Sequence, residues 1–387
     1  MTIRPKKWYS MVSVYEAMKP KINFPRLILF ILVAVVLFGG IFAVFYLMFR
    51  QRDASLTYEK VGIAAISEYT VSGGYLAYAT DSELVQLNVE DTKRSTVIRL
   101  DNGSIDGFGV SSSMIVAYAG SSLQLRNFDP LTLNGTIRGV ACGSSHFAAL
   151  RTNKLNGLDS IVVFNASAEA VGNPIDFAES KVVNFGFETG YGRELLWVIS
   201  VNTQASLPVT TVRLYDYNND GAMSYYPSFY EQSIERVYFT EDSVFLVGTE
   251  DIIRYNMDSS RERYRVGIYG KEVMDVASGS GTVRFLLKPR SGGNEHILYT
   301  LALAEADAPN TTMLTVYVGE NIVNAFLQSN GIRIVTRTRL ISYSFSGKNT
   351  PSADIILEYP ADAALKLNDA SFLLVSGKEC FITKRES

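Results

Sequence analysis

The sequence has little cysteine and little histidine. Its 387 residues include two cysteines, Cys142 and Cys380, and two histidines, His146 and His296. Two cysteines exclude a disulfide-built scaffold and a zinc site made of cysteines. Two histidines leave too little imidazole for most histidine-based metal centres and catalytic relays. The G-x-S-x-G nucleophile motif is also missing, so the sequence gives no support for nucleophilic catalysis.

The sequence also lacks an excess of charge of either sign. Charged residues make up 19% of the chain, and 36 basic against 39 acidic side chains give a net charge of −3. A chain without a basic field is not expected to bind nucleic acid. Hydrophobic residues at 47% exclude a disordered chain.

Strand-forming residues and turn residues are abundant. The chain has 22 tyrosines, 21 phenylalanines and 29 glycines, a composition that favours strands joined by tight turns. Short apolar runs beyond residue 50 are separated by pairs such as Asn102-Gly103, Asn156-Gly157 and Asn330-Gly331, which supply the positive φ angles of hairpins. We therefore expect an all-β domain.

A single long apolar run lies near the start of the chain. Residues 27–49 read LILFILVAVVLFGGIFAVFYLMF and contain no charge. At about 1.5 Å per residue this run spans roughly 34 Å, enough to cross the hydrocarbon core of a bilayer. No small-x-small cleavage site precedes Arg50, so we expect an uncleaved transmembrane helix in contact with membrane lipid.

The charges beside this run predict its orientation. Residues 1–26 carry six basic residues against one acidic residue, a net charge of +5. The more positive flank stays in the cytoplasm. We therefore expect a cytoplasmic basic tail over residues 1–26, a membrane span over 27–49, and an extracytoplasmic domain over 50–387.

The exported part is repetitive. A unit of four short strands recurs, with starts near residues 66, 105, 140, 182, 234, 273, 322 and 363. Spacings of about 40–50 residues are typical of four-stranded propeller blades. The sequence therefore predicts an eight-bladed β-propeller, with seven blades as the alternative because the interval from 182 to 234 is long.

The two ends of the exported part complement one another. The last copy, from residue 363, holds about three strands, whereas SLTYEKVGIA before the first copy has a strand-like centre. Donation of this N-terminal strand to the last blade would close the ring and hide its open edges.

The repeat length, the apolar second strand and the eight copies resemble the quinoprotein-like (PQQ-repeat-type) β-propeller superfamily. The layout is similar to single-pass, membrane-anchored bacterial propellers of unassigned function. The resemblance implies an eight-bladed propeller over about residues 55–387. The tryptophan-docking repeat of that superfamily is missing, since Trp197 is the one tryptophan after residue 49, and this puts quinone binding in doubt.

One turn resembles a calcium loop. Asp216, Asn218 and Asp220 lie in the pattern Asp-x-Asn-x-Asp-Gly, which brings alternate oxygens together. The twelfth position is Pro227 rather than glutamate, so either a hairpin-borne calcium site or a plain Asn/Asp-rich turn fits. These three residues are the metal candidates, and no other cofactor is predicted.

These features favour a binding or scaffold protein over an enzyme. We expect a membrane-anchored propeller whose loops, notably 202–208, 289–296 and 305–312, recognise a protein or an envelope polymer. The alternatives are a quinone- or calcium-dependent enzyme acting at the propeller funnel, and a transmembrane sensor.

Overall fold

The computed structural model describes the propeller but not the N-terminal segment. It describes residues 55–385 apart from residues 64–68, 73, 81–82, 100–103, 191–192, 203, 205, 218–221, 231, 258, 280, 291–295, 305–311 and 346–350. The predicted tail and membrane span lie outside these residues. Within the described part of the chain, no helix has the length and apolar character that a bilayer crossing requires.

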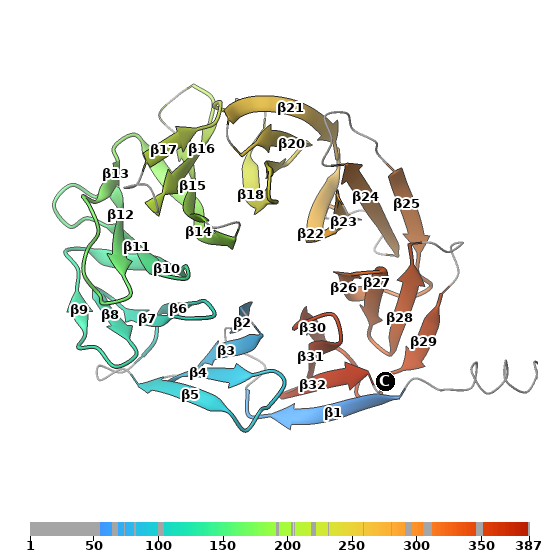
Figure 1. Cartoon of the computed structure of the whole chain (residues 1–387). Helices are drawn as coiled ribbons and strands as arrows, with labels where there is room; N and C mark the ends of the chain where they lie inside the picture. The colour runs from blue at the N-terminus through green and yellow to red at the C-terminus, as the bar shows by residue number, and fades with distance from the viewer. Residues whose placement is uncertain are drawn as a thin grey trace, which may run out of the picture. The chain divides into compact units, whose positions relative to one another are not determined.

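Eight four-stranded antiparallel sheets form a ring (Figure 1). We number them blades 1 to 8 in chain order. This confirms the prediction of an eight-bladed β-propeller, and the seven-bladed alternative is wrong. The interval after residue 182 holds a single blade, whose first two strands are 11 and 10 residues long.

The first strand of each blade lies nearest the centre of the ring, and the fourth is outermost (Figure 1). The first strands are β2 (Tyr69–Ser72), β6 (Gly107–Val110), β10 (Thr136–Cys142), β14 (Ser180–Gly190), β18 (Ile234–Phe239), β22 (Lys271–Gly279), β26 (Ile322–Gln328) and β30 (Ala363–Lys366). The second strands are β3 (Tyr75–Ala79), β7 (Ile115–Ala119), β11 (His146–Thr152), β15 (Arg193–Asn202), β19 (Ser243–Gly248), β23 (Thr282–Pro289), β27 (Gly331–Thr336) and β31 (Ser371–Ser376).

The third and fourth strands complete the blades. The third strands are β4 (Glu83–Asn88), β8 (Ser122–Leu125), β12 (Asp159–Asn165), β16 (Val209–Asp216), β20 (Asp251–Asn256), β24 (Ile297–Ala304), β28 (Arg339–Ser344) and β32 (Glu379–Arg385). The fourth strands are β5 (Ser95–Arg99), β9 (Leu131–Thr132), β13 (Ile175–Phe177), β17 (Ala222–Tyr225), β21 (Ser259–Gly267), β25 (Thr312–Tyr317), β29 (Ala353–Ile356) and β1 (Leu56–Val61).

Strand β1 closes the ring. It pairs antiparallel with β32 from Leu56↔Arg385 to Val61↔Cys380, so the outer strand of blade 8 comes from the start of the domain. This is the arrangement expected from the three-stranded last copy.

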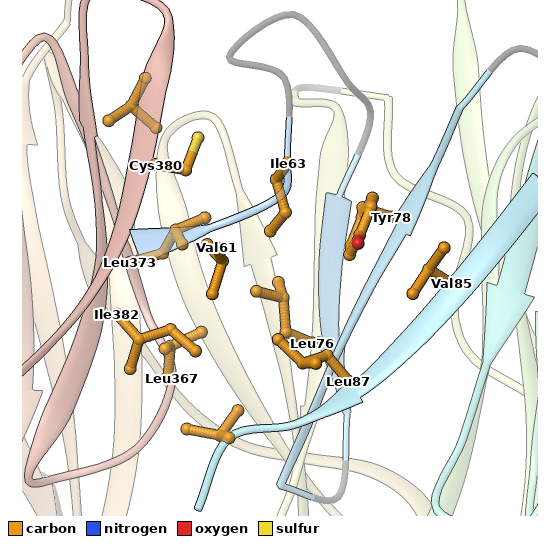
Figure 2. Close-up of a cluster of buried hydrophobic side chains, with 12 residues drawn as sticks. Val61, Ile63, Leu76, Tyr78, Val85, Leu87, Leu367, Leu373, Cys380 and Ile382 are labelled. Carbon is orange, nitrogen blue, oxygen red and sulfur yellow. The ribbon is translucent and has the colours of Figure 1, made fainter. Parts of the chain in front are cut away.

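The hydrophobic core is divided among the contacts between blades. Eight clusters of buried side chains each join two neighbouring blades. Figure 2 shows the cluster between blades 8 and 1, where Val61, Leu373 and Ile382 meet Leu76 and Leu87. Because each blade is covered on both faces, its middle strands are largely buried, as in β19, where all six residues are buried.

Polar side chains join the blades around the inside of the ring. Strands β10, β14, β18, β22 and β26 each contain a β-bulge near their start. After three of these bulges, a side chain binds both its own strand and the next blade. Asn184 Nδ2 donates to the Glu235 carbonyl (3.4 Å), Asn324 Nδ2 donates to the Ala364 carbonyl (2.7 Å), and Asp275 accepts from the Leu327 N–H (2.8 Å). The bulges therefore aim polar groups across the inter-blade contacts.

Candidate functional site

The ring has two faces with different connections. Because the strands of each blade alternate in direction, the links between blades and the links from second to third strands lie on one face. We call this the crossover face. The turns from first to second and from third to fourth strands lie on the other, which we call the hairpin face.

Exposed apolar side chains gather on the crossover face. Nine large apolar residues are exposed among the described residues, and seven of them lie in crossover-face links or at strand ends on that face. The seven belong to blades 3 to 7 and their links: Leu155, Val183, Leu207, Tyr230, Tyr269, Tyr317 and Ile356. Leu155 and Ile356 are 86% and 77% exposed. Seven of the nine thus share one face of the ring, spread over blades 3 to 7.

Several charged side chains on the crossover face lie in ion pairs. Ion pairs join Glu235 with Arg290 (3.2 Å), Glu272 with Lys288 (2.8 Å), Asp251 with Arg265 (3.6 Å), Glu83 with Arg99 (2.7 Å), Asp354 with Arg339 (2.5 Å), and Glu379 with Lys60. Paired charges attract few external ions, so contact at these pairs is expected to depend mainly on the apolar groups beside them.

A buried aspartate supports the turn that carries Leu155. Asp159 is fully buried at the start of β12, and its carboxylate accepts hydrogen bonds from Arg138 Nη1 (3.1 Å) and the Val182 N–H (3.0 Å). The Lys181 ammonium lies 3.4 Å from Asp159 and 3.2 Å from the Gly157 carbonyl. These contacts tie the turn to both blade 3 and blade 4, so Leu155 projects from a rigid support.

A second feature is a cavity of about 580 Å³ among the inner strands of blades 1 to 4. It is lined by Tyr69, Thr70, Phe108, Gly109, Val110, Val140, Ala141, Cys142, Gly186 and Phe187. Its size is within the usual range for a small-molecule site, and its lining residues carry no charge. The described lining of the cavity therefore holds no charged side chain that could pair with an ionic ligand.

A histidine–glutamate pair lies on the hairpin face between blades 3 and 4. His146 Nδ1 is 2.5 Å from Glu194 Oε2, and the carboxylate also accepts from the Ser145 N–H (2.8 Å) and the Ser144 hydroxyl (3.1 Å). Tyr217 lies against the imidazole, with ring centroids 5.4 Å apart. Since Ser144 binds the carboxylate rather than the imidazole, this arrangement holds the turn in place and does not form a nucleophile–base pair.

The environment of Glu194 favours its charged form. Burial raises its pKa, but the hydrogen bonds from His146 and Ser145 and the charge of His146 outweigh burial and bring the pKa below its ordinary value. The carboxylate is therefore a stabilising anion at neutral pH.

We expect Glu194→Gln to lower the free energy of unfolding by about 2 kcal/mol at neutral pH, because charge-assisted hydrogen bonds to a buried carboxylate are lost. Because the folded-state pKa is depressed, this contribution is present above the ordinary value of 4.5 and is lost as the pH falls through the folded-state pKa. Thermal unfolding of both proteins between about pH 7 and about pH 3 measures this, and the difference should shrink toward the acid end. A difference that stays constant with pH contradicts the prediction.

The predicted calcium loop is only partly described. Asp216 is the last residue of β16 and is half-buried, whereas Asn218 and Asp220 lie outside the described residues. In the part of the chain that is described, no group of three or more histidine, cysteine, aspartate or glutamate residues could hold a metal ion. The calcium site stays a prediction.

The predicted contact loops agree in part with the exposed apolar residues. The loop at 202–208 carries Leu207, which is exposed. Most of 289–296 and 305–312 lies outside the described residues. Tyr230 and Tyr269 belong to no motif that the sequence predicts as a contact. The signal for each is an aromatic residue beside proline, glycine or polar residues, away from the apolar runs.

Neither a family model nor a curated protein matches the sequence. Many solved structures are similar in fold, including three with TM-scores above 0.5. The WD40 domain of SCAP from fission yeast has a TM-score of 0.58 at 10% identity and covers 86% of this chain and 98% of its own. The computationally designed Ika8 protein has a TM-score of 0.56 at 10% identity and covers 86% and 100%. BamB from Moraxella catarrhalis has a TM-score of 0.52 at 8% identity and covers 85% and 100%.

This chain shares its fold with these three proteins. At such low identity these similarities establish the β-propeller alone, and they leave the quinoprotein-type assignment as a prediction.

Proposed function

We propose that this chain is a membrane-anchored extracytoplasmic binding protein whose crossover face holds a protein partner. The observation that carries the proposal is the gathering of seven exposed apolar side chains on that face. Three of them are tyrosines, Tyr230, Tyr269 and Tyr317, and tyrosine is enriched at the energetic centres of protein interfaces.

Two further observations support this function. The apolar groups lie on a rigid ring, so little conformational entropy is lost when a partner binds. The ion pairs around them, such as Glu235–Arg290 and Glu272–Lys288, leave no excess charge of one sign at these positions, so a partner needs no strong charge to contact them.

The membrane anchor rests on the sequence. The uncharged run at 27–49 and the +5 tail before it support a single span with the propeller outside the cytoplasm. Protease protection of the full chain in sealed membrane vesicles tests this orientation. Digestion of the propeller from the cytoplasmic side contradicts it.

We expect a photo-reactive amino acid at position 230 or 317 of the full-length protein, in its native membranes, to crosslink to one partner. The double variant Leu155→Ser/Tyr269→Ser should reduce that product about tenfold, because two apolar contacts of about 0.7 kcal/mol each are lost.

The matched control is Phe128→Ser, which removes an exposed aromatic ring in the β8–β9 turn of the hairpin face. It should leave the crosslink unchanged. Equal crosslinking from position 128, or an undiminished product in the Leu155/Tyr269 variant, overturns the proposal.

The enzymatic and sensor alternatives stay predictions. A quinone- or calcium-dependent activity at the funnel would require a ligand in the inner cavity or at Asp216, Asn218 and Asp220. Spectroscopy of the purified protein and calcium titration would test these two ligands.

A further inference from the structure

A groove of about 510 Å³ lies between blades 3 and 4 on the crossover face. Strand β13 and the link to β14 form one wall, and the ends of β15 and β16 and the link to β18 form the other. Its lining residues are Asp176, Phe177, Ala178, Glu179, Ser180, Asn202, Val209, Thr211, Arg213, Ser228 and Tyr230. It is large enough to hold one long side chain and part of the backbone that carries it.

The carboxylates of this groove are unpaired within the described part of the chain, unlike several others on the crossover face. Asp176 and Glu179 are both exposed, and neither takes part in an ion pair or side-chain hydrogen bond among the described residues. Elsewhere on this face, acids such as Glu235 and Glu272 are paired with a cation. Asp176 and Glu179 are thus available to a cation from outside.

Arg213 is the one cationic residue among the described residues that line the groove, and an aromatic ring of the groove already contacts it. The Arg213 guanidinium lies over the Phe177 ring, 5.4 Å from the ring centroid, on the floor of the groove. Two carboxylates against one guanidinium leave a formal charge of −1. The groove therefore attracts a positively charged group more strongly than a neutral or negative one.

Apolar groups border this negative groove. The ring of Tyr230 is exposed and lines it, and Leu207 is exposed in the β15–β16 link that leads into Val209. An aromatic ring beside carboxylates can pack on the aliphatic stem of a basic side chain and attract its cationic end.

We propose that this groove binds a lysine or arginine side chain of the partner protein, flanked by apolar residues that contact Tyr230 and Leu207. This inference rests on the proposed function and names the chemistry of the partner segment. The cation of the partner pairs with Asp176 and Glu179. The apolar residues on either side of that cation cover the exposed apolar side chains beside the groove.

The first test uses labelled five-residue peptides and the full-length protein in detergent. The probes have capped ends and the sequence serine–leucine–X–leucine–serine, where X is lysine, norleucine or glutamate. At low ionic strength the lysine peptide should bind about tenfold tighter than the norleucine peptide. The lysine ammonium gains one cation–π contact with Tyr230 and two weak ion pairs with Asp176 and Glu179. The glutamate peptide should bind more weakly than both.

The variant Asp176→Asn/Glu179→Gln should lower the affinity for the lysine peptide to that for the norleucine peptide. Both side chains are exposed, so the thermal midpoint should not change. The matched control is Asp129→Asn/Glu241→Gln, which removes the same charge from exposed residues in hairpin-face turns. The control should bind as the wild type does.

A second test separates this inference from the proposed function. If the native crosslink from position 317 is lost in Leu155→Ser/Tyr269→Ser but persists in Asp176→Asn/Glu179→Gln, the groove proposal is overturned and the binding face stands. Loss in both variants supports both. Equal affinity of the lysine and norleucine peptides for the wild-type protein also overturns the groove proposal.

Discussion

A chain that ends at Gly377, and so lacks β32, is expected to lose the closed ring and with it a cooperative thermal transition. Strand β32 pairs with β31 on one side and with β1 on the other. Its removal leaves β1 without its partner strand and uncovers the core shared by blades 8 and 1. Two strand edges are then open to pairing with other chains.

A single substitution in β32 tests the same role of this strand without shortening the chain. Ile382→Asp places a carboxylate at a fully buried position and should cost about 4 kcal/mol or more. Lys384→Ala, two residues further along the strand and only half-buried, serves as the control and should change stability by less than about 0.5 kcal/mol. Thermal unfolding and limited proteolysis measure both. A truncated chain that unfolds cooperatively near the wild-type temperature contradicts the role of β32.

Asp159→Ala is the second substitution with a large expected effect. It removes a fully buried carboxylate and leaves Arg138, Lys181 and the Val182 N–H without the acceptor they share. Breaking a buried pair costs about 3–5 kcal/mol; Arg138 and Lys181 are half-exposed and regain water, so we expect about 3 kcal/mol.

Urea unfolding at neutral pH measures this loss. Asp129→Asn, at an exposed hairpin-face turn, is the control and should have little effect. Because Asp159 also supports the turn with Leu155, the Asp159 variant should reduce the crosslink from position 230. A loss below about 1 kcal/mol would show that the buried carboxylate is not an important link between blades 3 and 4.

The sequence predicted the number of blades because each blade buries both faces. Such burial makes the middle strands largely apolar, so that runs such as SVFLVG around Phe245 stand out at a regular period. Predicted starts at 234, 322 and 363 coincide with the first residues of β18, β26 and β30. The start predicted at 140 falls inside β10, which begins at Thr136, because the bulge around Arg138 interrupts the apolar alternation.

The functional residues were harder to predict. Glu194 lies 48 residues from its partner His146, and no local pattern relates them. Asp176 and Glu179 look like ordinary surface acids; that they are unpaired while their neighbours on the same face are paired emerges only from the folded ring. The positions of contacts between blades depend on register, which composition does not encode.

The pairing of β1 with β32 sets the order in which the protein matures. Thr57 donates a hydrogen bond to the carbonyl of Lys384, a residue 327 positions later in the chain. At about ten residues per second, the ribosome needs roughly half a minute to supply that partner. During this time β1 presents an unpaired strand edge, so blade 8 and the closed ring form only after the last strand has been made.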